Sequence, residues 1–132
     1  MGRPVLRIVW LIALATVTVA VVAVAPDAIR DRLVFGTFAT AGAPPRVDYC
    51  GRRYYPADPP RSMSRKEIVD SLARNGLTGT TQIDTAPSGM SVITNVLPPQ
   101  VRAEFHTNVC TMEVWVQTGP DAYVAYGLSG GP

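Results

Sequence analysis

An uncharged apolar run near the amino end constrains this chain more than any other feature. It covers 18 positions, 8–25, and only Thr16 and Thr18 interrupt it. With Val5 and Leu6 the apolar stretch reaches 21 positions around Arg7, whose side chain can snorkel back to the headgroups. About 20 helical residues cross the roughly 30 Å hydrocarbon core of a bilayer. The sequence therefore predicts a transmembrane anchor over residues 1–25 with a short cytoplasmic amino end.

A cleaved signal peptide is the alternative interpretation, because it also combines a basic start with an apolar core. The run is longer than the roughly 7–15 residues of a typical signal core. The best small-x-small cleavage site, Ala23-Val24-Ala25, is followed by Pro26, a residue expected to hinder cleavage there. A second site at Val21-Val22-Ala23 remains open, so a secreted domain is kept as the alternative to an anchored one.

The stretch 26–46 is predicted to connect the anchor to a folded unit. Its first part continues the helix or lies along the membrane interface, where Phe35 and Phe38 are expected to rest on headgroups. Small residues and a proline pair then form a spacer. The folded unit is expected at 47–128, followed by a flexible tail at 129–132.

Two cysteines, Cys50 and Cys110, stand near the two ends of this predicted unit. A unit of roughly 80 residues has only a marginal core, so a covalent cross-link would stabilise it. In an oxidising compartment the two thiols are expected to pair. The chain therefore predicts a disulfide-bonded domain outside the cytoplasm, with two separate buried thiols in a cytoplasmic domain as the alternative.

The clearest secondary-structure signal predicts one amphipathic helix over 65–74. Ser64 and Glu67 have the spacing of a capping box, in which each side chain binds the other residue's backbone N–H. Apolar residues then recur at helical spacing, and Asn75-Gly76 is a typical helix end.

After Gly76 the pattern changes to the alternation of strands, with strands predicted at 80–85, 91–97, 105–118 and 122–128. The predicted fold is α+β: an N-terminal transmembrane helix, then a small domain with one helix packed on an antiparallel sheet of about four strands.

The longest predicted strand, 105–118, has two distinct faces. Cys110, Met112, Val114 and Val116 alternate onto one face, which is expected to be the core. Trp115 belongs to the other face, where it is expected either to cover an open sheet or to be buried under residues 26–45.

No motif in the sequence indicates catalysis, a cofactor or a metal. The chain lacks a Gly-rich phosphate loop, a GxSxG elbow and a paired-carboxylate pattern. His106 and Cys110 are four residues apart and so share a strand face. With Cys50 and Glu104 they could form a metal site, but a disulfide would consume both thiols. Basic and acidic residues balance beyond residue 25, which also argues against nucleic acid as a partner.

The sequence favours a non-enzymatic role, as an accessory subunit of a membrane complex or an envelope binding module. The alternatives are a secreted domain that binds an envelope or host ligand and, third, a small enzyme whose site the sequence does not reveal. Membrane lipid and one or more protein partners are the expected contacts; the oligomeric state is not predicted. Arginines interleaved with tyrosines are typical of interface hot spots and of surfaces for anionic groups. The candidate partner-binding residues are Arg52, Arg53, Tyr54, Tyr55, Trp115 and Tyr123.

Overall fold

The computed structural model describes residues 3–37, 41–97, 100 and 110–128. The chain divides into two compact units, Met1–Arg30 and Asp31–Pro132. The helix α1 (Arg3–Phe35) is 33 residues long and continues through Pro26. Its last turn, from Asp31 onward, belongs to the second unit.

The apolar side chains of α1 between Ile8 and Val17 are 57–67% exposed. Over the residues that the structure describes, no helix is both long and apolar enough to qualify as a membrane span. This finding corrects the predicted transmembrane helix. The prediction counted all of positions 8–25 as one apolar run, whereas the structure describes the side chains of this run at 8–18.

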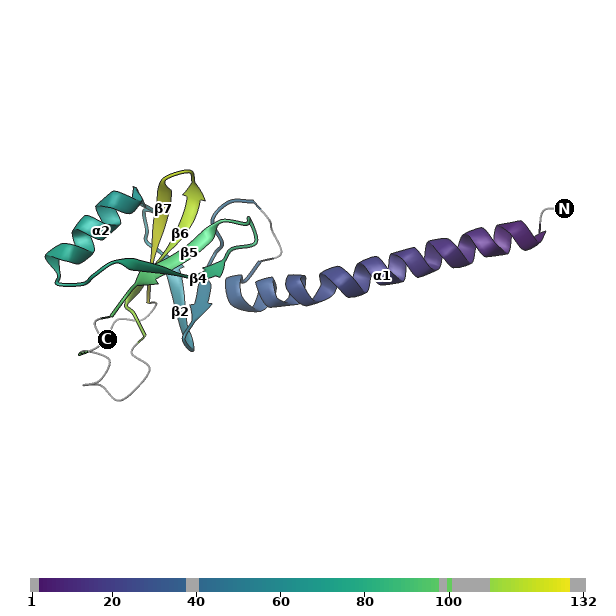
Figure 1. Ribbon diagram of the computed structural model, residues 1–132, viewed down its shortest axis with the longest axis horizontal. Helices are drawn as coiled ribbons and strands as arrows, with labels where there is room; N and C mark the ends of the chain where they lie inside the picture. Colours follow the sequence, from purple (N-terminus) through teal and green to yellow (C-terminus); the bar gives the residue numbers. More distant parts are fainter. Residues whose placement is uncertain (1–2, 38–40, 98–99, 101–109, 129–132) are drawn as a thin grey trace. The chain divides into compact units, whose positions relative to one another are not determined.

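The second unit is built on one antiparallel sheet that curls upon itself (Figure 1). Its strands follow the order β1-β2-β7-β6-β5-β4, and β3 pairs with β7 beyond the end of β2. The strands are β1 (Val47–Tyr49), β2 (Arg52–Pro56), β3 (Ser62–Met63), β4 (Thr80–Thr85), β5 (Ser91–Asn95), β6 (Glu113–Gly119) and β7 (Ala122–Leu128).

The predicted sheet of about four strands was wrong, because residues 47–63, where no strand was predicted, contribute three more. Cys50 and Gly51 have φ angles of 56° and 70°, which is the geometry of a two-residue type I′ turn. The turn joins β1 and β2 into a hairpin in which Tyr49 pairs with Arg52. The bounds predicted for β4 and β7 are confirmed, and β5 and β6 overlap their predicted strands.

Helix α2 (Arg65–Arg74) has the predicted bounds and both predicted ends. The Ser64 N–H donates to Glu67 Oε2 at 2.7 Å and the Glu67 N–H donates to Ser64 Oγ at 3.2 Å, which completes the capping box. At the other end Gly76 has a φ of 72°, and the Leu77 N–H donates to Leu72 O at 3.0 Å. This is the Schellman arrangement of helix C-termini.

The two faces of the sheet carry separate apolar clusters. Helix α2 lies against one face of the sheet (Figure 1). Its residues Ile68 and Leu72 form the first cluster there with Ile93, Trp115 and Tyr123 of the strands. The second lies inside the curl and consists of Phe35, Val47, Tyr54, Ala86, Val92, Val114, Val116 and Tyr126. The predicted α+β class therefore holds, with a helix on one face of the sheet and a core within its curvature.

Two side chains, Phe35 and Met112, differ from their predicted environments. Phe35 is fully buried in the inner cluster and does not lie on a membrane surface; Phe38 is outside the described residues. Val114 and Val116 are buried as predicted, but Met112 is 68% exposed. The reason is that β6 begins only at Glu113, so strand alternation does not extend back to Met112.

Two tyrosine hydroxyls anchor loops to the inner cluster. Tyr126 donates to Pro44 O at 2.6 Å, and burial raises the pKa of Tyr126 to about 12. Tyr54 donates to Thr111 O at 2.7 Å. Burial also raises the pKa of Tyr54, while its hydrogen bond to Thr111 and the positive charge of Arg52 act in the opposite direction. Both hydroxyls therefore remain protonated donors at neutral pH.

Candidate functional site

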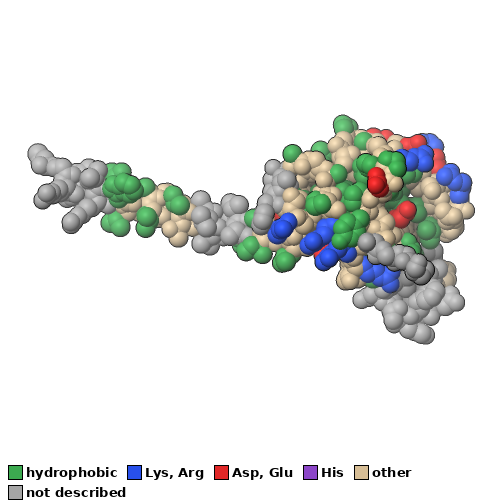
Figure 2. Space-filling view, turned by 180° about the vertical axis from the view of Figure 1, so that it is seen from behind, with side chains coloured by type: hydrophobic (Ala, Val, Ile, Leu, Met, Phe, Trp, Pro, Cys, Tyr) green, Lys and Arg blue, Asp and Glu red, His purple; other side chains and the backbone are tan. Residues whose placement is uncertain are grey.

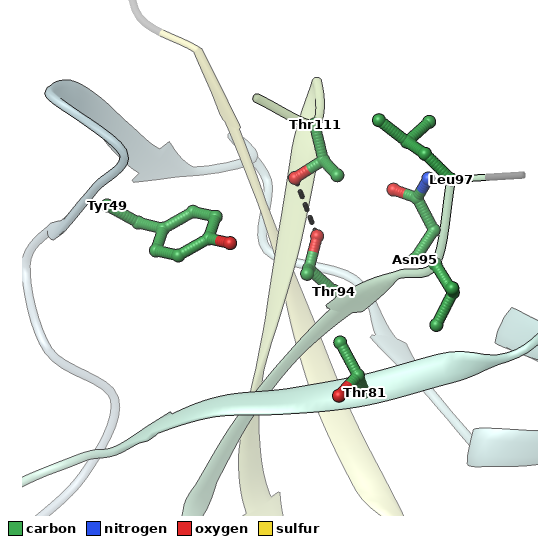
Figure 3. Close-up of a pocket in the computed structure, with 7 residues that line it drawn as sticks. Tyr49, Thr81, Thr94, Asn95, Leu97 and Thr111 are labelled. Carbon is green, nitrogen blue, oxygen red and sulfur yellow. Dashed lines mark hydrogen bonds between the residues drawn. The ribbon is translucent and has the colours of Figure 1, made fainter. Parts of the chain in front are cut away.

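A polar hollow of ≈ 160 Å³ opens at one end of the curled sheet. We call it the threonine hollow; it is lined by Tyr49, Thr81, Thr94, Asn95, Val96, Leu97 and Thr111 (Figure 3). Tyr49 comes from β1 and Thr81 from β4, the two outermost strands of the sheet order. The curl therefore brings the two edges of the sheet to opposite sides of one hollow.

Two buried hydroxyls form the polar centre of this hollow. Thr94 Oγ1 and Thr111 Oγ1 lie 2.6 Å apart, and Figure 3 shows the Tyr49 ring pointing toward this pair. Each hydroxyl also lies within hydrogen-bond distance of Glu113 O, at 2.9 Å from Thr94 and 3.2 Å from Thr111.

The number of protons on the two hydroxyls determines which hydrogen bonds they can still make with a ligand. Each threonine has one proton and two lone pairs. One proton is used between Thr94 and Thr111, and the other points to Glu113 O. The pair therefore presents lone pairs to the hollow, which would accept hydrogen bonds from N–H or O–H donors.

The predicted disulfide is confirmed and lies beside the threonine hollow. Cys50 and Cys110 are bonded, with their Cα atoms 5.9 Å apart. Tyr49 directly precedes Cys50, Thr111 directly follows Cys110, and both neighbours line the hollow. The bond ties the β1–β2 turn to the residues that lead into β6, so it fixes the spacing of two walls.

The two arginines of the hairpin have different surroundings. Arg53 Nε lies 3.1 Å from Asp48 Oδ1, and the hydrogen bond to Asp48, followed by one to Tyr55, raises the pKa of Arg53. Arg52 is exposed, and over the residues described the structure gives it no ion pair. With Asp48 and Gly51 the two arginines also line a surface depression of ≈ 340 Å³.

The six predicted partner-binding residues do not gather into one surface. Arg52, Arg53 and the 38% exposed Tyr55 offer surface on the hairpin. Tyr54 is fully buried in the inner cluster. Trp115 and Tyr123 are 4% exposed beneath α2; their role in the structure is packing, which leaves little surface for a partner.

A larger and more apolar groove of ≈ 420 Å³ lies beside α2. Leu72, Leu77 and Trp115 are among its lining residues, and it borders the threonine hollow at Asn95 and Thr111. Among the residues the structure describes, no group of acidic, histidine and cysteine side chains could hold a metal ion. His106 and Glu104 fall outside those residues.

The sequence did not single out the threonines of the hollow. The available signal was the polar pair Thr94-Asn95, which interrupts the predicted strand 91–97 between two apolar pairs of residues. Figure 2 shows basic and acidic side chains together on one face of the folded unit, in line with the balanced composition. Recognition of a charged partner would therefore depend on local residues such as Arg52.

Comparison with known proteins identifies no relative of this chain. No family model, no curated protein and no solved structure matches the chain. The threonine hollow, the adjacent disulfide and Arg52 are therefore the features from which a function has to be inferred.

Proposed function

We propose that the folded unit is a non-enzymatic binding module that acts outside the cytoplasm. Its binding site is the threonine hollow together with Arg52, and its partner is anionic. The observation that carries the proposal is the disulfide, which holds a wall of hydroxyl acceptors in place. Arg52 pairs across the hairpin with Tyr49, which lines the hollow, and has no ion pair in the described part of the chain.

The disulfide supports the compartment. Disulfides persist in oxidising surroundings and are rare where glutathione and thioredoxin keep thiols reduced. Cys50 is exposed and Cys110 is half-buried, so a reducing cytoplasm would have access to the bond. We therefore assign the module to an extracytoplasmic location.

The chemistry of the hollow supports binding without catalysis. A nucleophilic threonine needs an adjacent base to take its proton. The protons of Thr94 and Thr111 are instead directed to each other and to a backbone carbonyl, Glu113 O. Such hydroxyls can orient a polar ligand, and the Arg52 guanidinium can bind a carboxylate in a bidentate manner.

The charge part of the proposal is tested with one pair of variants. The oxidised full chain is titrated with an acetylated, amidated Thr–Glu peptide of repeating Thr-Thr-Glu-Glu sequence, which places both residue types on each face of an extended strand. The same peptide with lysine in place of glutamate serves as the control probe. We expect the acidic peptide to bind and Arg52→Glu to weaken binding by about tenfold, the size expected for one charge-assisted contact. Arg74→Glu makes the same charge change at another exposed arginine, on α2, and should change the affinity less than twofold.

Two results would overturn the proposal. An equal loss in both arginine variants would show that only net charge matters. Binding of neither peptide at millimolar concentration would remove the anionic partner.

A further inference from the structure

Among the described residues, the strand β4 ends the sheet on one side and pairs only with β5. The Val96 N–H donates to Gly79 O, which makes Gly79 and Val96 a hydrogen-bonded pair. Hydrogen-bonded and non-hydrogen-bonded pairs alternate along an antiparallel ladder. Thr81 is therefore hydrogen-bonded to Thr94, whereas the backbone N–H and C=O groups of Thr80 and Gln82 point away from β5, to the open edge.

With respect to the residues that the structure describes, only the first half of this edge is open. The register shifts between Gln82 and Asp84, and such a bulge ends regular pairing. Beyond the bulge the Ala86 N–H donates to Met90 O, so Thr85, and not Asp84, turns its backbone groups to the edge. The Thr85 N–H is occupied there by Asp84 Oδ1 at 2.7 Å. The available backbone groups are thus at Thr80 and Gln82, and the side chain of the residue between them, Thr81, lines the threonine hollow.

The opposite side of the hollow is formed by Tyr49 of β1, which is the other end of the strand order. In the strand pairing of the described residues, β1 and β4 are not hydrogen-bonded to each other. We propose that an extended, acidic peptide segment of a protein partner binds as an added strand on β4 at Thr80 and Gln82. This inference rests on the proposed function and names the class of its partner.

The open edge of β4 and the hollow beside it together indicate that the occupant is a peptide. The free groups of Thr80 and Gln82 supply alternating donors and acceptors, the pattern that another extended backbone matches. Every second side chain of an added strand points to the same face as Thr81. The ≈ 160 Å³ available there suits one small side chain, and the acceptor lone pairs of Thr94 and Thr111 select one that donates, such as serine, threonine or asparagine.

Arg52 supplies the preference for acidic segments. It belongs to the same face of β2 as Tyr54, the tyrosine whose pKa its charge affects. The Tyr54 hydroxyl donates to Thr111 O, and Thr111 lines the hollow. A carboxylate two residues from the side chain that enters the hollow lies on the same face of the added strand. It would therefore meet a positive charge at the hollow's margin.

The test removes one outward-facing N–H from the edge. Gln82→Pro deletes the N–H of Gln82, which β5 does not use, and proline is tolerated on edge strands with that orientation. Gln82→Ala is the matched control, because it loses the same side-chain hydrogen bonds and keeps the N–H. We expect Gln82→Pro to weaken binding of the Thr–Glu peptide about tenfold and Gln82→Ala to weaken it less than twofold.

A modified peptide gives the same answer without touching the protein. Methylating alternate backbone nitrogens of the Thr–Glu peptide removes its N–H donors and keeps its charges and side chains. We expect the methylated peptide to bind the unaltered chain at least tenfold more weakly. This measurement stays decisive if Gln82→Pro fails to fold, which a thermal melt would reveal.

The outcomes separate the two proposals. If the methylated and unmethylated peptides bind equally and Arg52→Glu weakens both, strand addition is refuted while the anionic site stands. If neither peptide binds, the proposed function fails as well. If binding depends on peptide N–H groups but not on Arg52, the edge accepts peptides and the acidic preference is refuted.

Discussion

Removing the disulfide is expected to cost this unit a large part of its stability. The bond joins residues separated by 60 positions and closes most of the sheet into one covalent loop. In the chain-entropy account, a closed loop of this length stabilises the folded state by about 4 kcal/mol. Domains of this size are stable by only about 5–15 kcal/mol, so Cys50→Ser with Cys110→Ser should bring the unit close to unfolding.

The assay compares thermal and urea unfolding of the oxidised parent, the reduced parent and the double variant. For a domain of about 100 residues, a loss of 4 kcal/mol corresponds to a Tm lower by about 15 °C or more. The reduced parent should melt with the double variant, because both lack the same cross-link. A double variant that melts within about 3 °C of the oxidised parent would refute the reasoning, since the loop would then contribute almost nothing.

The turn geometry allows a second, smaller effect to be separated from loop closure. Cys50 has a φ of 56°, a left-handed conformation that costs an ordinary residue about 1–2 kcal/mol. Cys50→Asn with Cys110→Ser creates the Asn-Gly sequence that type I′ turns favour. This variant should regain about 1 kcal/mol over the double serine variant. Equal stability of the two variants would show that the turn is not strained.

Three further predictions follow from the packing, the helix cap and a buried hydroxyl. Trp115→Ala should cost about 3–5 kcal/mol in urea unfolding, because Trp115 is buried between the sheet and α2; a loss below about 1 kcal/mol would contradict that packing. Ser64→Ala should cost about 1 kcal/mol by breaking the capping box, whereas an exposed serine without such a role would cost almost nothing. The pKa of Tyr126 is raised from 10.0 to about 12, so the folded state keeps a proton that the unfolded state loses across that interval. Stability present below pH 10 should fall as the pH rises from 10 to 12, and Tyr126→Phe should make the unfolding free energy less dependent on pH in that window.

The elements predicted correctly are those whose signals are local. The capping box and the glycine after it define α2 within a dozen residues, so its bounds follow from the sequence. The β1–β2 hairpin was missed although its signal is also local. The two residues Cys50-Gly51 form its turn. Cysteine is less common than asparagine at the left-handed first position of a type I′ turn, so the sequence did not indicate this turn. The pairing of β2 with β7 joins segments far apart in the chain, so no local sequence pattern predicts it.

The candidate site shows the same division. The disulfide could be inferred from two cysteines and the size of the unit. The threonine hollow could not, because Thr81, Thr94 and Thr111 come from three separate segments that meet only through the curl of the sheet. A threonine in a strand is ordinary when seen alone. The membrane anchor was inferred from apolar run length, and among the described residues the structure identifies no such span.

The two halves of β4 argue together for the strand-addition site. An exposed edge strand is a liability, and proteins usually blunt it along its whole length with bulges or charges. Here a bulge and the Asp84 side chain, which accepts from the Thr85 N–H, occupy the second half only. The half left open at Thr80 and Gln82 is the half beside the threonine hollow. If the edge only had to be protected against pairing with other chains, a charged residue in place of Thr81 would complete that protection. Thr81→Lys should therefore leave the fold intact and abolish binding of the Thr–Glu peptide, by placing a long side chain at the hollow; unchanged binding would show that the peptide does not enter there.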